Sequence, residues 1–190
     1  MADMSKVAEL QDVLRQQKGL QNITNRINAA TGIQPMVVEL RPLLMDLFRV
    51  EAAHVYVREK NHRDVYTFVA PTGQTGEVKT ALGPQTLPGF VAATGKMIQV
   101  NDFSDPAQTE AYQDFPLSES HNRRFGINVR QILAMPIFYG GETLGVVEIL
   151  NKKEAMLFGQ KEPALLQNIS ELLGVTLYNF LLMDPKAKRV

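Results

Sequence analysis

The sequence predicts an α+β fold in which a mainly antiparallel sheet is covered by helices. Apolar residues recur every three or four positions in both terminal segments, which is the period of an amphipathic helix. Between these segments, short runs of β-branched and aromatic residues alternate with turn residues, which is typical of β-hairpins. Hairpins between helices favour an antiparallel sheet with helices packed on it, and 190 residues are enough for one such domain with appended helices.

Two helices are predicted before the first strand. The first should end near Gly32, because glycine is favoured just after a helix C-terminus. Its apolar stripe consists of Val7, Leu10, Leu14, Leu20, Ile23 and Ile27. The second helix is expected over Met36–Phe48, and Pro42 inside it should kink or break it, since proline lacks the N–H that a helix interior needs.

Six extended segments are predicted after these helices. They cover 53–58, 65–70, 77–81, 97–100, 131–138 and 143–150. A short helix over 89–95 precedes the fourth segment, and Gly140-Gly141 supplies a tight turn between the last two. Pro136 is expected at a sheet edge or a bulge, because it cannot donate a ladder hydrogen bond.

The last helix has a wide apolar stripe from Leu165 to Leu181 and should stop at Asp184-Pro185. We divide the chain into an N-terminal amphipathic helix (1–32), a domain that includes the C-terminal helix (33–183) and a basic tail (184–190). The apolar surface of the terminal helices exceeds what one small sheet should cover. It favours a homodimer held by these helices, the alternative being that the whole surface packs on the sheet.

The composition narrows the class of protein. The chain has 20 basic and 20 acidic residues, so its formal net charge of zero gives no general attraction to nucleic acid or to an anionic membrane. It has no cysteine, which excludes disulfides, thiol nucleophiles and thiolate metal sites. No apolar run reaches the roughly 18–20 residues of a membrane helix, and no signal-peptide pattern is present. We therefore expect a cytoplasmic protein without nucleic-acid or membrane partners.

Four segments in a fixed order resemble a known family. Leu87–Lys96 resembles a short helix that ends at a Thr-Gly turn, and 100–106 resembles the loop that follows it. The run Leu133–Lys152 is similar to the family's hairpin, and Phe158–Leu166 to the start of its last helix. Over roughly 36–183 the chain is thus similar to a GAF domain, the small-molecule sensor module of signalling proteins.

This resemblance implies a GAF/PAS-like antiparallel sheet of about six strands, with helices on one side and a ligand pocket under the loops on the other. Members of the family bind cyclic nucleotides, tetrapyrroles, amino acids or other metabolites, and some serve only as dimerisation units. Their flanking helices commonly pair between subunits. Without cysteine, this chain cannot attach a bilin covalently or perform the thiol chemistry of the family's methionine-sulfoxide-reducing branch.

One family motif departs from its pattern. Cyclic-nucleotide binders often carry Asn-Lys, then Phe, three residues and Asp-Glu. Asn151-Lys152 and Phe158 match this motif, but the last pair is Glu162-Pro163. The departure argues against a cyclic nucleotide as the ligand and leaves other metabolites open.

Any ligand is expected between the sheet and the long irregular segment 101–128, since long loops inside compact domains are often functional. The short helix, this segment and the neighbouring strands offer apolar and polar side chains of the kind that small-molecule pockets combine. The candidate ligand-binding residues are Phe90, Val91, Asp102, Phe103, Tyr112, Phe125, Ile127, Met135, Ile137 and Glu148. Glu148 lies inside an apolar strand, where a carboxylate must meet a partner, solvent or a ligand.

Catalytic patterns are missing from the sequence. Gly89 and Gly95 are one residue too far apart for a phosphate loop, and Met97 replaces its hydroxyl residue. The three histidines show no metal-ligand spacing, and no strand–elbow–helix pattern surrounds Ser118 or Ser120. We therefore predict no enzymatic activity and no metal site, and the sequence leaves the question of a cofactor open.

Two functions follow from this interpretation. In the first, the chain is a sensory or regulatory domain that binds a small molecule and relays the signal through its flanking helices in a dimer. In the second, it is a ligand-free dimerisation or protein-docking module of a larger regulator or assembly ATPase.

Overall fold

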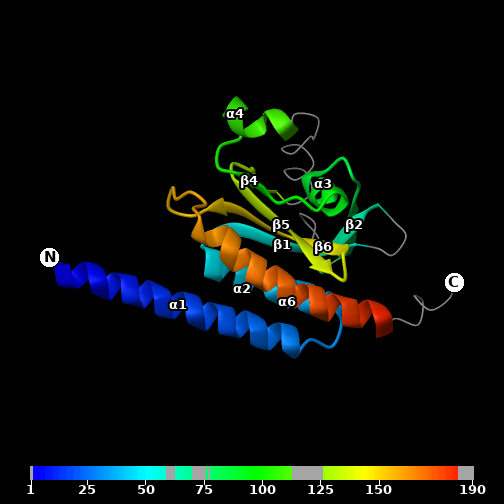
Figure 1. Ribbon diagram of the computed structural model, residues 1–190, viewed down its shortest axis with the longest axis horizontal. Coiled ribbons are helices and arrows are strands. Elements are labelled where there is room, and N and C mark those ends of the chain that lie inside the picture. Colours follow the sequence, from blue (N-terminus) through cyan, green and yellow to red (C-terminus); the bar gives the residue numbers. More distant parts are fainter. Residues whose placement is uncertain (1, 59–62, 70–75, 77, 113–125, 184–190) are drawn as a thin grey trace.

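The computed structural model describes residues 2–58, 63–69, 76, 78–112 and 126–183, and Figure 1 shows their arrangement. The predicted α+β class is confirmed. The elements in chain order are α1 (Ala2–Asn28), α2 (Ile33–Phe48), β1 (Val50–Arg58), β2 (Val65–Val69), β3 (Val78–Leu82), α3 (Leu87–Thr94), β4 (Ile98–Val100), α4 (Pro106–Thr109), η1 (Glu110–Tyr112), β5 (Ile132–Tyr139), β6 (Glu142–Lys152) and α6 (Lys161–Met183).

The strands form one six-stranded sheet in the order β3-β2-β1-β6-β5-β4, and every neighbouring pair is antiparallel. Helices α1, α2 and α6 lie on one side of the sheet, and α3 and α4 lie on the other (Figure 1). The predicted turn between β5 and β6 is confirmed, since Tyr139 pairs with Glu142. Gly140 and Gly141 between them have φ angles of 60° and 84°, which favour glycine in a two-residue hairpin.

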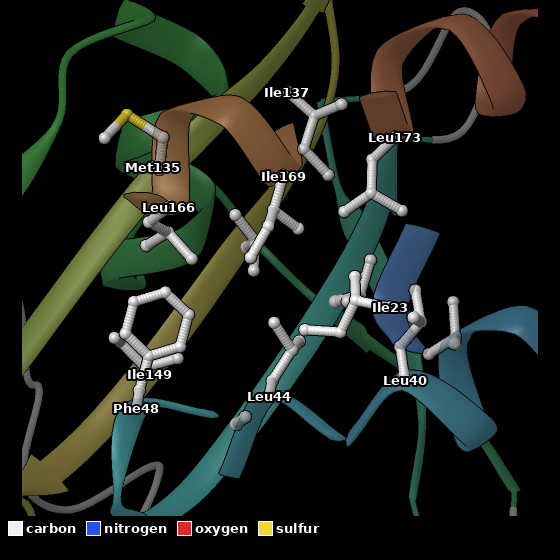
Figure 2. Close-up of a cluster of buried hydrophobic side chains, with 14 of the residues drawn as sticks. Ile23, Leu40, Leu44, Phe48, Met135, Ile137, Ile149, Leu166, Ile169 and Leu173 are labelled. Carbon is white, nitrogen blue, oxygen red and sulfur yellow. The ribbon is translucent and has the colours of Figure 1, made fainter. Parts of the chain in front are cut away.

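Both faces of the sheet are buried, and alternation along each strand separates two cores. On β6, Val147 and Ile149 face the core that α1, α2 and α6 complete, whereas Val146 and Leu150 face the core beneath α3. Figure 2 shows side chains of all three helices, such as Ile23, Leu40 and Leu173, meeting strand residues in the first core. We call this the helix-side core and the other the α3-side core.

Helix α2 is continuous from Ile33 to Phe48 and is not broken at Pro42, contrary to one of the two outcomes expected from the sequence. An interior proline costs about 3 kcal/mol. Leu40 and Leu44, on either side of it, are completely buried in the helix-side core. Packing of this apolar stripe therefore outweighs the lost hydrogen bond.

Pro136 lies where the sequence predicts, at a locally unpaired edge. Strand β4 ends its pairing with β5 at Ala134, so no strand lies beside Pro136 on that side. The Ser170 hydroxyl on α6 donates to the Pro136 carbonyl oxygen at 2.6 Å, and a register irregularity follows between Ile137 and Phe138. Proline and this hydrogen bond together leave no donor or free acceptor at that point of the edge.

The two halves of α1 have different surroundings. Ile23 and Ile27 are buried in the helix-side core, while Leu10 and Leu14 are each 63% exposed. The first half extends past the body of the molecule (Figure 1). The division at residues 32/33 stays a prediction, and within the described residues no helix is long and apolar enough to cross a membrane.

Candidate functional site

Five of the ten sequence-predicted site residues lie in the α3-side core or pack against it. Val91 is fully buried there, and Phe90, Phe103, Tyr112 and Ile127 are half-buried against it. Helix α3 and the segment that follows β4 therefore cover this face of the sheet, as the sequence predicts. The position of the ligand remains a prediction.

Local sequence signals set the two ends of α3. The Thr86 hydroxyl accepts a hydrogen bond from the Gly89 amide at 3.3 Å, and this caps the helix N-terminus. Gly95 ends the helix in a left-handed conformation with φ 66°, as the Thr-Gly turn predicts. The Phe90 ring, on the half-buried side of the helix, contacts the Tyr112 ring edge-on at a centroid distance of 6.0 Å.

Asp102 is exposed, and its carboxylate organises a turn. The Ser104 hydroxyl and amide both donate to Asp102 Oδ1, at 2.6 Å and 2.8 Å. These two hydrogen bonds lower the pKa of Asp102 below its ordinary value. Asp105 caps α4 in a similar way, through a hydrogen bond from the Ala107 amide. The carboxylates of this loop therefore stabilise its backbone conformation.

A polar group lies in the middle of the sheet on the α3 side. Glu148 is completely buried, and its direct strand neighbour is His54 of β1. His54 Nδ1 lies 3.3 Å from Glu148 Oε1, and the Tyr56 hydroxyl donates to the same oxygen at 3.3 Å. The sequence predicted that Glu148 needs a partner or a ligand, and cross-strand pairing supplies the partner. These three side chains are the polar centre of the candidate site.

Met135 and Ile137 lie on the opposite face of the sheet and are therefore separated from the other candidates. Both belong to the helix-side core, where Figure 2 shows them beside α6 residues such as Leu166 and Leu173. Because both faces of the sheet are apolar, alternation alone could not show which face they occupy. Phe125, the remaining candidate, lies outside the described residues.

The residues that match the cyclic-nucleotide motif make structural contacts at the other end of β6. Asn151 accepts from the Arg130 and Gln131 amides at 2.7 Å and 3.0 Å. Lys152 donates to Glu162 at 2.9 Å, and Phe158 is 2% exposed. The motif thus joins β6 to the start of α6, and the departure at Glu162 still leaves a carboxylate paired with Lys152.

A groove of about 1040 Å³ lies elsewhere, where the β5–β6 hairpin, the C-terminal end of α3 and that of α6 meet. None of the ten predicted site residues lines it. Arg58 and Arg63 lie on its rim with the aromatic residues Phe138, Tyr139 and Tyr178. The feature of the sequence that could have pointed to this groove is the aromatic pair Phe138-Tyr139 beside Gly140-Gly141, because residues next to a tight hairpin turn are often exposed. No cluster of three potential metal ligands occurs among the described residues.

Comparison with known proteins gives one consistent family. A model of the GAF domain family matches residues 17–177. The chain is 29% identical over 124 residues to the dual 3',5'-cyclic-AMP and -GMP phosphodiesterase 11A of Takifugu rubripes, covering 64% of this chain and 13% of that protein. It is 22% identical over 164 residues to "Probable 3',5'-cyclic phosphodiesterase pde-5" of Caenorhabditis elegans, covering 80% and 21%. The chain therefore spans only a small part of these relatives.

Solved structures share the fold. The GAF domain from a phosphoenolpyruvate-protein phosphotransferase of Coxiella burnetii has a TM-score of 0.67 at 18% identity, over 87% of this chain and 94% of that one. The free methionine-R-sulfoxide reductase from Neisseria meningitidis, solved with its substrate, has a TM-score of 0.64 at 15% identity, over 87% and 89%. At these sequence identities, the similarity shows a shared fold and nothing further about function.

Proposed function

The chain belongs to the GAF domain family of sensory and regulatory modules, and we propose that it binds a small-molecule ligand and relays binding through its flanking helices within a homodimer. The ligand lies on the α3 side of the sheet. The observation that carries this proposal is the polar centre of His54, Tyr56 and Glu148. Burying a carboxylate in an apolar core costs free energy even when His54 and Tyr56 hydrogen-bond to it, so its retention there suits a site that recognises a polar ligand.

The surroundings of the polar centre support a binding site. Val91 lies on the same side of the sheet, and the aromatic side chains of Phe90, Phe103 and Tyr112 pack against the same core. An apolar lining with a few convergent polar groups is the usual composition of small-molecule sites. Glu148 and His54 would orient a ligand that offers a hydrogen-bond donor, while the aromatic rings would cover its apolar part.

A cyclic nucleotide is the first ligand to test, because the two curated relatives are named as cyclic-nucleotide phosphodiesterases. The departure from the motif at Glu162-Pro163 does not argue against a cyclic nucleotide at the α3-side core. Lys152 and Glu162 bond to each other between β6 and α6, and neither lines the α3-side core. The departure therefore lies in a structural contact that keeps its carboxylate.

The test is a titration of the full chain with cyclic AMP and with cyclic GMP. Binding is measured by calorimetry and by the shift in the thermal unfolding midpoint. A ligand present at about 100 times its Kd should stabilise the fold by about 2.7 kcal/mol. Glu148→Gln should weaken binding, whereas the exposed control Glu171→Gln on α6 should leave it unchanged. If neither nucleotide binds, native mass spectrometry of the purified protein shows whether another small molecule is retained.

A second function is favoured by the exposed apolar residues of α1. Val7, Leu10, Val13 and Leu14 are 45–63% exposed, which suits a helix that pairs with another copy or with a partner. In this alternative the chain is a ligand-free dimerisation or docking module. A dimer that is free of small molecules and insensitive to Glu148→Gln would favour it over the sensor. Neither function includes catalytic turnover, so retained hydrolysis of ATP or of a cyclic nucleotide would contradict both.

A further inference from the structure

The groove beside the β5–β6 hairpin is a second surface, separate from the polar centre beneath α3. Four parts of the chain line it: Arg58 at the end of β1 with Arg63 just before β2, the end of α3, the hairpin and the last turns of α6. In Figure 1 the hairpin lies between α3 and the C-terminal half of α6. Phe138 fixes this arrangement, because its ring lies so close to Gly95 at the end of α3 that a side chain there would collide with it.

The groove presents aromatic and aliphatic side chains to solvent. Phe138 is 46% exposed, Tyr139 38% and Leu182 52%. The centroids of the Tyr139 and Tyr178 rings are 4.4 Å apart and the interplanar angle is 30°, so the two rings form one continuous surface. Tyrosine and other aromatic residues are the usual energetic centres of protein interfaces.

The shape favours a protein segment over a small molecule. Small-molecule pockets bury about 70–90% of the ligand surface, which requires enclosing walls. Here Phe138, Tyr139 and Leu182 remain 38–52% exposed, and the volume of about 1040 Å³ is at the upper end for such pockets. An extended or helical peptide could fill this space and cover the exposed rings.

The charged residues that line the groove favour a partner with acidic side chains. Among the described residues that line the groove, the charged ones are Arg58, Arg63 and Glu142. Arg63 is exposed just before β2, where its guanidinium can reach a docked chain. A guanidinium binds a carboxylate through two parallel hydrogen bonds, which neither water nor a lysine reproduces.

We propose that this groove is a docking surface for a segment of a partner protein that combines acidic residues with an aromatic or aliphatic anchor. The anchor packs on Phe138, Tyr139 and Tyr178, and the acidic residue pairs with Arg63. Helix α6 supplies Tyr178, Leu181 and Leu182 to the groove, so a docked segment contacts the last helix of the domain directly. The inference goes beyond the proposed function, because the groove shares no residue with the polar centre beneath α3.

The test selects a phage-displayed library of random dodecapeptides on the immobilised full chain, with prior depletion on the double variant Arg63→Glu, Leu182→Asp. Enriched peptides should carry Asp or Glu near an aromatic or aliphatic residue. Fluorescence anisotropy with an enriched peptide should show that each single variant weakens binding about tenfold, as for the loss of one interface contact. Both residues are exposed, so the variants should keep the wild-type circular dichroism and melting temperature.

The matched control is Lys161→Glu, which makes the same charge change at the other, N-terminal end of α6 and should leave binding unchanged. A selection that enriches no peptide over the double variant would overturn the proposal. So would enriched peptides without acidic residues, or binding that all three single variants reduce equally. The cyclic-nucleotide titration measures a different site, so each proposal can fail while the other stands.

Discussion

Lys152 and Glu162 form a largely buried ion pair between the last strand and the last helix, with Nζ and Oε1 2.9 Å apart and side-chain exposures of 8% and 21%. Lys152 also donates to the Phe48 carbonyl oxygen at the end of α2, and Glu162 Oε2 accepts from the Gly159 amide. Burial raises the pKa of Glu162, but the hydrogen bond and the charge of Lys152 outweigh it and hold this pKa below its ordinary value of 4.5. The pair therefore ties β6, α2 and α6 together.

Glu162→Gln should lower the free energy of unfolding by about 2 kcal/mol at neutral pH, because it leaves a buried ammonium without its counter-charge. A depressed folded-state pKa stabilises the fold above the ordinary pKa of 4.5, and this contribution is lost as the pH falls through the lower folded-state value. The difference between wild type and variant in urea unfolding should therefore shrink on acidification. Glu154→Gln is the control, since its pair with Arg49 is exposed and should contribute about 0–1 kcal/mol. A difference that is independent of pH would contradict this account.

Asn151 should matter for two separable reasons. Its φ of 55° is left-handed, and its buried carboxamide makes four hydrogen bonds, to the Arg130 and Gln131 amides, the Asn128 carbonyl oxygen and the Glu51 carboxylate. Asn151→Ala should cost about 3 kcal/mol from backbone strain and unsatisfied amides. Asn151→Gly relieves the backbone strain but does not restore the side-chain hydrogen bonds. It should therefore be about 1 kcal/mol more stable than Asn151→Ala in chemical unfolding. Equal stability of the two variants would show that the backbone conformation contributes nothing.

Most of the fold follows from sequence, because its signals are local. Period and turn chemistry place the terminal helices, the β5–β6 hairpin at Gly140-Gly141 and the C-terminus of α3 at Gly95. The break considered at Pro42 was wrong because the burial of Leu40 and Leu44 is a tertiary effect that local propensity does not contain. Helix α1 ends at Asn28, before the predicted Gly32, as is common for helix boundaries.

The candidate site was harder to predict because its residues meet through strand register. Glu148 was recognised as unusual, but its partner His54 lies on another strand, and no local pattern gives that pairing. Met135 and Ile137 were grouped with residues of the other face, since a sheet buried on both sides has apolar residues at every position. The groove beside the hairpin needs the end of α6 to pass Phe138, which is again a tertiary contact.

Gly174 should be required for the packing of α6 on the hairpin. A Cβ at this position would collide with the backbone carbonyl of Phe138, which cannot move without shifting the strand. Gly174→Ala gains up to about 1 kcal/mol of helix propensity, yet we expect a net loss of stability of about 1–3 kcal/mol from the collision. Thermal unfolding should show a lower midpoint. The control is Gly19→Ala in α1, where the nearest atom is the flexible end of the Leu47 side chain, and it should be neutral or stabilising.

The exposed half of α1 tests the proposed homodimer. Leu10 and Leu14 are each 63% exposed within one chain, so a charge at Leu14 should leave the fold of the protomer intact. In a helix-paired dimer the same charge would be buried without a partner, which should weaken association by several kcal/mol. Sedimentation should therefore give a dimer for the wild type and a monomer for Leu14→Asp, with unchanged circular dichroism.

Phe180→Asp is a weaker test, because Phe180 also packs against the helix-side core and its loss should destabilise the protomer. Gln11→Asp, at a polar exposed position of the same helix, should remain dimeric. A wild type that sediments as a monomer at micromolar concentration, or a Leu14→Asp variant that stays dimeric, would show that α1 does not hold the subunits together.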